Sequence, residues 1–117
     1  MQDTLSCQRT NIDESTISSA LQLLNQKNDW LESRVQIFAL LGNRARLDIV
    51  YILLNYKRLC VCDFCDLLNM STPAISQHLR KLKDSKLLFS KKEGVTVFYA
   101  INDAFREELA KYLDIKI

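Results

Sequence analysis

The sequence predicts a mainly α-helical protein that carries a two-stranded β-hairpin near its C-terminal end. Up to about residue 85, apolar residues recur every three or four positions, which is the period of helices with one buried face. Between residues 87 and 101 the period changes to two, as in strands. The chain has 117 residues and 48% hydrophobic content, which suits one core, so we expect residues 1–117 to form a single domain.

The N-terminal third is expected to be a loose arm followed by two helices. The arm should cover residues 1–12, and the first helix residues 13–26, because Ile17, Leu21 and Leu24 form one stripe. The second helix should end near Gly42, since glycine commonly follows the last turn of a helix. Its apolar stripe consists of Leu31, Val35 and Phe38.

The middle of the chain predicts a helix-turn-helix over residues 61–85. A helix capped by Asn43 precedes it, with a stripe of Leu47, Val50, Tyr51 and Leu54. A short helix should cover residues 61–68. Thr72 is then expected to cap the next helix, with Pro73 in its first position, where the fixed φ of proline is suitable. That helix should end near Ser85.

A hairpin and a last helix complete the pattern. Strands are expected over residues 87–92 and 95–101 within the segment 87–101, with Glu93 and Gly94 as the turn. Residues 104–117 should form the last helix, with Phe105, Leu109 and Tyr112 on one face. Helices, a helix-turn-helix, a hairpin and a helix follow one another in the order of a winged helix-turn-helix.

The second helix of this motif has the pattern of a DNA-reading helix. At 100° per residue, Ile75, Leu79 and Leu82 lie on one side and polar residues lie on the other. Glutamine can form paired hydrogen bonds to adenine, and basic side chains can reach phosphate or guanine. For His78, at the edge of the apolar stripe, a packed position is slightly favoured over a base contact. The candidate DNA contacts are Ser71, Thr72, Ala74, Ser76, Gln77, His78, Arg80, Lys81, Lys91 and Lys92.

Charge is concentrated in the same region. The whole chain has a net charge of +2, whereas residues 80–93 contain six basic and two acidic residues and carry +4. A basic stretch in a near-neutral protein fits a phosphate contact surface, and it fits a solvated helix face about equally well.

Three of the four cysteines, Cys60, Cys62 and Cys65, fall within six residues just before the reading helix. The fourth, Cys7, belongs to the arm. No signal peptide and no membrane-length apolar run are visible, so we expect a cytoplasmic protein with no membrane partner. Thiols stay reduced in that compartment, and crowded cysteines there indicate metal or redox chemistry.

Taken together, these motifs resemble the ArsR/SmtB family of metalloregulatory repressors over roughly residues 30 to 103. The resemblance rests on Arg44-Ala45-Arg46-Leu47-Asp48-Ile49, Leu59-Cys60-Val61-Cys62-Asp63, Ser76-Gln77-His78-Leu79 and the Lys92-Glu93-Gly94 wing. It implies a homodimer, joined through its terminal helices, that binds double-stranded operator DNA and releases it when a metal or metalloid binds. The Cys-Val-Cys-Asp element with a third cysteine is similar to the arsenite-responsive members of the family.

The donor set favours As(III) or Sb(III) as the inducer. Three thiolates suit soft ions, whereas zinc usually takes four ligands. Two alternatives stay open: a cadmium or lead repressor that uses Cys7 with Cys60 and Cys62, and a thiol redox switch. Family members with a zinc site on the last helix use paired Asp/His and His/Glu ligands there. This helix has no histidine and Asp103 stands alone, so we expect no such site.

The cysteine spacing also suggests how binding could act. Cys60 and Cys65 would lie about 140° apart around a helix, so one ion could gather all three sulfurs only by unwinding the first turn. That distortion would reach the reading helix through the short turn at residues 69–71. Catalysis is not expected, because the chain has a single histidine and its C-x-x-C at residues 62–65 lacks a βαβ context.

Overall fold

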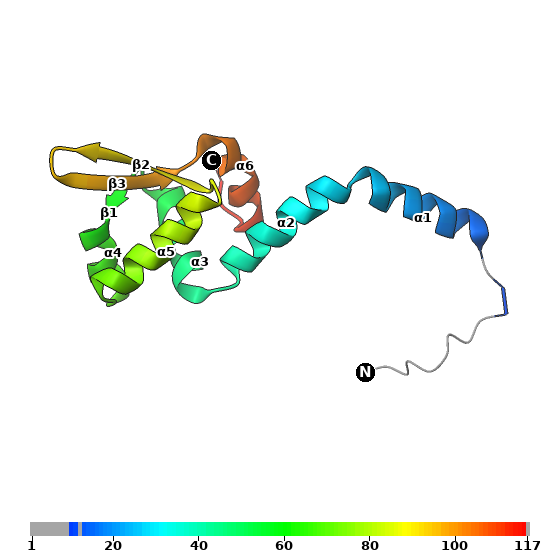
Figure 1. Cartoon of the computed structure of the whole chain (residues 1–117), viewed down its shortest axis with the longest axis horizontal. Coiled ribbons are helices and arrows are strands. Elements are labelled where there is room, and N and C mark those ends of the chain that lie inside the picture. The colour runs from blue at the N-terminus through cyan, green and yellow to red at the C-terminus, as the bar shows by residue number, and fades with distance from the viewer. Residues whose placement is uncertain (1–9, 12, 117) are drawn as a thin grey trace. The chain divides into compact units, whose positions relative to one another are not determined.

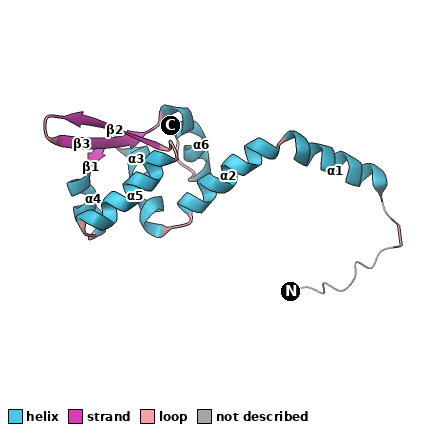
Figure 2. Ribbon diagram, viewed as in Figure 1, coloured by secondary structure: helices cyan, strands magenta, loops and turns pink. Residues whose placement is uncertain are grey.

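The computed structural model describes residues 10, 11 and 13–116. Within that part the order is α1 (Glu14–Gln26), α2 (Asn28–Leu41), α3 (Arg44–Asn55), β1 (Leu59–Cys60), α4 (Val61–Leu68), α5 (Thr72–Asp84), β2 (Leu88–Glu93), β3 (Thr96–Ile101) and α6 (Asp103–Tyr112). Figures 1 and 2 show this mainly helical chain with one antiparallel hairpin, which confirms the predicted fold class.

The chain divides into two compact units, one up to Arg34 and one over Val35–Ile117. In the first unit, α1 begins at the predicted place because the Asp13 carboxylate accepts from the backbone N–H and the hydroxyl of Thr16, at 3.0 and 2.7 Å. α1 has no buried residue. Its leucines are therefore exposed, and their apolar face lacks a partner among the described residues of the first unit.

The second unit holds the core. Its buried residues are Ile37, Ile49, Val50, Leu53, Leu54, Phe64, Ile75, Leu79, Leu82, Leu87, Leu88, Ile101 and Leu109. The predicted stripe of α5 is fully buried. The predicted stripe of α3 is partly wrong, because Tyr51 is 49% exposed and Ile49 and Leu53 are buried in its place. The buried face of α3 is therefore formed by Ile49, Val50, Leu53 and Leu54.

The sheet has three strands in the order β1-β3-β2, all antiparallel, rather than the two expected. The additional strand β1 pairs Leu59 with Tyr99 and Cys60 with Phe98. A strand of two residues has no visible period, so the sequence pattern could not reveal it. Gly94 and Val95 form the hairpin turn, because Glu93 already pairs with Thr96.

The predicted ends of two helices need correction. Ser71, not Thr72, caps α5, and its hydroxyl accepts from the backbone N–H of Ala74 at 3.3 Å. Pro73 is consequently the second helical residue, still within the first turn, where no N–H is needed. The last helix covers Asp103–Tyr112 instead of residues 104–117. It ends because Asp114 has a φ of 57° and Ile115 donates back to the carbonyl of Ala110 at 2.8 Å.

Candidate DNA-binding surface and thiol site

The exposed side of α5 carries most of the predicted DNA contacts. Burial of Ile75, Leu79 and Leu82 against the core fixes the rotation of the helix and turns the polar residues outward. Exposed positions are Ser71, Thr72, Gln77, Arg80 and Lys81, and half-buried positions are Ala74, Ser76 and His78. The face is thus a row of amide, hydroxyl and cationic groups, which are the groups that read base edges and phosphates.

His78 is half-buried and packs against α3. Its Nδ1 lies 3.4 Å from a guanidinium nitrogen of Arg46, which also donates through Nε to the carbonyl of Leu40 at 2.8 Å. Burial lowers the pKa of His78 below its ordinary value, and the charges of Arg46 and Lys81 lower it further. This is the packed position that the sequence slightly favoured, and Arg46 is the partner that the sequence did not reveal.

The two lysines of the wing lie on opposite faces of the sheet. Lys91 pairs with Phe98 and Lys92 with Val97, and successive strand residues alternate between faces. Lys92 shares its face with Leu88, whose side chain is buried in the core. Lys91 shares the outer face with Phe98 and lines an open hollow there. The two side chains therefore leave the wing on opposite faces of the sheet.

Cys60 is the last residue of β1 and the N-cap of α4. Its backbone N–H donates to Oδ2 of Asp63 at 3.0 Å, and its thiol donates to the same oxygen at 3.3 Å. Asp63 is an acid in the first turn of α4, and its carboxylate holds Cys60 at the start of the helix. A cysteine held in this way keeps the first turn of α4 closed.

The other two cysteines point to different neighbours. Cys62 is exposed and, together with Cys60, lines a hollow of about 310 Å³ whose remaining walls are Val61 and the wing residues Val95, Thr96 and Val97. Cys65 instead lies with its sulfur 3.7 Å from the hydroxyl of Thr72, at the start of α5. Cys60 and Cys62 therefore share the wing-side hollow, whereas Cys65 contacts the reading helix.

These sulfurs do not form a closed metal site in the conformation observed. Among residues 10, 11 and 13–116, no group of three or more His, Cys, Asp or Glu side chains could hold a metal ion. Cys60, Cys62 and Cys65 are free thiols. Cys7, the possible additional ligand, lies outside the described residues.

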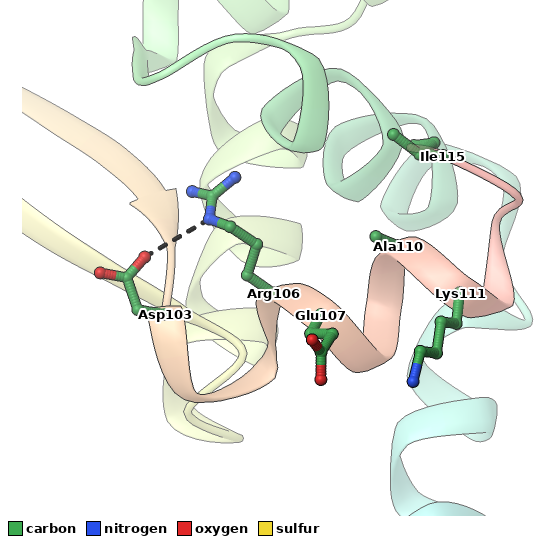
Figure 3. A pocket seen from close by; sticks show the side chains of 6 residues that line it. All are labelled: Asp103, Arg106, Glu107, Ala110, Lys111 and Ile115. Carbon is green, nitrogen blue, oxygen red and sulfur yellow. Dashed lines mark hydrogen bonds and ion pairs between the residues drawn. The ribbon is translucent and has the colours of Figure 1, made fainter. Parts of the chain in front are cut away.

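The last helix presents a different kind of surface. Figure 3 shows a hollow along α6 in which Asp103 and Arg106 face each other, with Nε of Arg106 donating to the Asp103 carboxylate at 3.4 Å. Glu107 and Lys111 line the same hollow. Asp103, the aspartate singled out at the start of this helix, is thus paired with a cation of its own helix.

No helix in the described part of the chain is long and apolar enough to cross a membrane.

Comparison with known proteins agrees with these features. Residues 43–88 match the family model described as "Bacterial regulatory protein, arsR family". The chain is 40% identical over 80 residues to the arsenical resistance operon repressor of Escherichia coli (strain K12), with 68% of each chain covered. It is 32% identical over 105 residues to the cadmium resistance transcriptional regulatory protein CadC homolog of Staphylococcus aureus, covering 90% of this chain and 85% of that one.

A solved structure supports the same assignment. The transcriptional regulator HlyU from Vibrio vulnificus CMCP6 superposes with a TM-score of 0.67 at 30% identity, covering 78% of this chain and 94% of that chain. The likeness in sequence and in structure extends over most of the relatives' length. The chain therefore belongs to the arsR family of bacterial regulatory proteins and is a DNA-binding transcriptional repressor, not an enzyme.

Proposed function

We propose that this protein binds double-stranded operator DNA as a homodimer and releases it when As(III) or Sb(III) binds to Cys60, Cys62 and Cys65. The arsenical resistance operon repressor among its relatives supports this inducer class. The observation that carries the proposal is the convergence of Cys60 and Cys62 on one hollow, with Cys65 one helical turn further along α4. Thiols are the donors that soft metalloids prefer.

Operator contact would be made by the exposed face of α5 and by the wing. In this arrangement Gln77 reads a base edge, while Arg80, Lys81 and the two wing lysines contact phosphates. Thr72 and Ser71, at the N-terminal end of α5, are placed for phosphate contacts because helix N-termini favour anions. Since operators with twofold symmetry match twofold dimers, a homodimer would place two α5 helices on two half-sites.

Ligation of the metalloid would compete with the cap of α4. A cysteine that binds the ion as thiolate has no proton to donate to Asp63, so the thiol hydrogen bond of Cys60 is lost. Bringing Cys65 to the same ion also requires its sulfur to leave Thr72. Binding therefore favours a conformation in which the first turn of α4 is open. A few kcal/mol of difference between the two conformations shifts such an equilibrium strongly.

The experiment is a release titration under reducing conditions. An operator fragment is first selected from random double-stranded DNA by binding to the protein, and its fluorescence anisotropy is followed as arsenite, antimonite, cadmium, lead or zinc is added. We expect arsenite and antimonite to lower the anisotropy at the lowest concentrations. Release by none of the five ions would contradict the proposal.

The second candidate function is that of a cadmium- or lead-responsive repressor. It is favoured by the similarity to the CadC homolog, 85% of whose length is covered by the match. In that case Cys7 would complete a site with Cys60 and Cys62. The discriminating variant is Cys7→Ser: loss of release together with a preference for cadmium or lead identifies the second candidate. Release by an oxidant without any metal would identify the redox switch instead.

A further inference from the structure

The segment with the first two cysteines is joined to the wing as well as to the reading helix. Cys60 pairs with Phe98 across β1 and β3, and Cys60 and Cys62 line a hollow whose opposite wall is the wing tip at residues 95–97. Figure 1 shows β1 beside β3, with α4 starting directly after it. Any movement of Cys60 therefore acts on β3 through the strand pairing.

A second connection lies two residues before Cys60. The guanidinium of Arg58 lies 3.8 Å from the ring centroid of Phe98 and donates through Nη1 to Oε2 of Glu93 at 2.6 Å. Glu93 is the last residue of β2, next to the hairpin turn. The pKa of Glu93 is held below its ordinary value mainly by this hydrogen bond. Arg58 thus ties the segment that leads into β1 to the far end of the wing.

These contacts form a continuous chain from Cys60 to Lys91, one of the two wing lysines. Phe98 is at once the strand partner of Cys60 and of Lys91, and the ring on which Arg58 rests. A planar guanidinium that is stacked and paired loses little freedom and holds its neighbours in one arrangement. β1 has only two residues, so displacing Cys60 removes half of its pairing with β3.

We propose that inducer binding at Cys60 and Cys62 is transmitted to DNA through the wing, with Arg58 as the positioning residue that makes the cysteine segment and the wing move together. This inference rests on the proposed function, since it takes those two cysteines as inducer ligands. When Cys60 leaves its place in β1, Phe98, Arg58 and Glu93 shift with it. The wing lysines then lose their position against the phosphates.

The test separates inducer binding from its effect on DNA. Arsenite binding is measured by the ultraviolet absorbance of sulfur–arsenic bonds, and operator affinity is measured by anisotropy with and without saturating arsenite. Arg58→Gln, which removes both the charge and the ion pair, should bind arsenite within about twofold of the wild type. Its ratio of operator Kd values with and without arsenite should fall by about tenfold, a typical allosteric coupling.

Two matched variants make the result specific. Arg58→Lys keeps a cation beside Glu93 and Phe98 and should retain most of the ratio, while Lys57→Gln removes a neighbouring charge and should leave it unchanged. An unchanged ratio in Arg58→Gln would overturn the proposal and assign the signal to the contact between Cys65 and Thr72. If arsenite produces no absorbance change in the wild type, the proposed function fails and the inference fails with it.

Hydrogen exchange provides a measurement on the unmodified protein. Arsenite should speed exchange of the backbone amides in the ladder that joins residues 59–60 to residues 98–99, where alternate amides of β3 face β1. Faster exchange confined to α4 and α5 would contradict transmission through the wing, whatever the variants show.

Discussion

His78 reports on the packing between α3 and α5, because it is the single histidine of the chain and sits against Arg46. Folding lowers its pKa below 6.5, so the unfolded chain takes up a proton at a higher pH than the folded chain does. The free energy of unfolding should therefore fall as the pH is lowered from 6.5 through the pKa of the folded state, and this contribution should level off below it.

Urea unfolding at pH 7.5 and pH 5.0 checks this expectation. His78→Gln should lose less stability between the two pH values than the wild type, because the titrating group is gone. The C2 proton of the one imidazole can be followed by NMR in the same range. A titration midpoint at or above 6.5 in the folded protein would show that burial does not control this group.

The cysteines provide the second prediction at the scale of single residues. Cys60→Ser and Cys62→Ser should bind the operator like the wild type, because serine is itself a good N-cap and Cys62 is exposed. Both should lose arsenite-induced release, with the ratio of operator affinities falling to about one. Cys65→Ser should weaken the response less if two sulfurs suffice.

The operator affinity of each serine variant must also be measured without arsenite, because loss of DNA binding would otherwise be mistaken for loss of the response. A serine variant that no longer binds the operator would place its cysteine in the fold of the unliganded protein. Retained release in Cys60→Ser or Cys62→Ser would exclude that residue as an essential ligand.

At the scale of elements, the register of the hairpin makes the two wing lysines unequal. Lys92 lies on the face of the sheet that packs toward the helices, and Lys91 lies on the outer face. Lys92→Ala should weaken binding to all DNA sequences and lower the salt dependence of log Kd by about one, as expected for one lost phosphate contact. Lys91→Ala serves as the matched variant and should have the smaller effect.

Base reading should be separable from phosphate contact. Gln77→Ala should change which base is preferred at one operator position and leave the salt dependence unchanged. A variant that removes the charges at 80, 81, 91 and 92 together should bind weakly at any sequence, and unchanged affinity of that variant would contradict the assignment of this surface.

The chain leaves α4, α5 and α6 in the same way, through a residue in the left-handed conformation, and this leads to a stability prediction. Each is followed by a non-glycine residue with positive φ: Asn69 at 53°, Lys86 at 74° and Asp114 at 57°. Asparagine and aspartate tolerate this conformation, whereas lysine is strained in it. Lys86→Gly should raise the free energy of unfolding by about 0.5–1 kcal/mol. Lys83→Gly, inside the last turn of α5, should lower it by about the same amount.

Helices and strands with a repeating pattern of apolar residues could be predicted from the sequence, whereas the contacts between them could not. The buried stripe of α5 follows from Ile75, Leu79 and Leu82 alone, because a helix must bury its apolar face. The contact between Cys65 and Thr72 and the clamp of Arg58 on Phe98 join residues far enough apart that no local pattern encodes them. The same is true of β1, whose two residues become a strand only because β3 lies beside them.

At the scale of the whole molecule, the predicted homodimer gives the exposed apolar helices a role. Ile17, Leu21 and Leu24 are each more than half exposed on α1, and Phe38 on α2 is 51% exposed while its ring lies 5.0 Å from that of Tyr112 on α6. Short helices need such faces covered to be stable. These exposed faces fit the predicted dimerisation through the terminal helices, but of the predicted face of α6 Leu109 is fully buried in the core and does not contribute.

Leu21→Glu combined with Leu24→Glu should shift the protein toward the monomer in sedimentation velocity and weaken operator binding by at least about tenfold, because each half-site then binds alone. Ser19→Glu adds a charge to the opposite side of α1 and is the control. Trp30, which lies between Lys27 and Arg34, offers a fluorescence signal for the same change. A folded monomer that binds the operator tightly would contradict the prediction.

The two-residue length of β1 bears on how fast the repressor can respond. Small units at the edge of a fold open far more often than the whole domain unfolds. Such local openings take between microseconds and seconds. The conformational step that limits release would therefore be the detachment of one short strand, not the unfolding of the core. The rate of DNA release after mixing with arsenite should accordingly follow the opening rate of this edge, and substitutions that lengthen its pairing should slow that release in stopped-flow anisotropy.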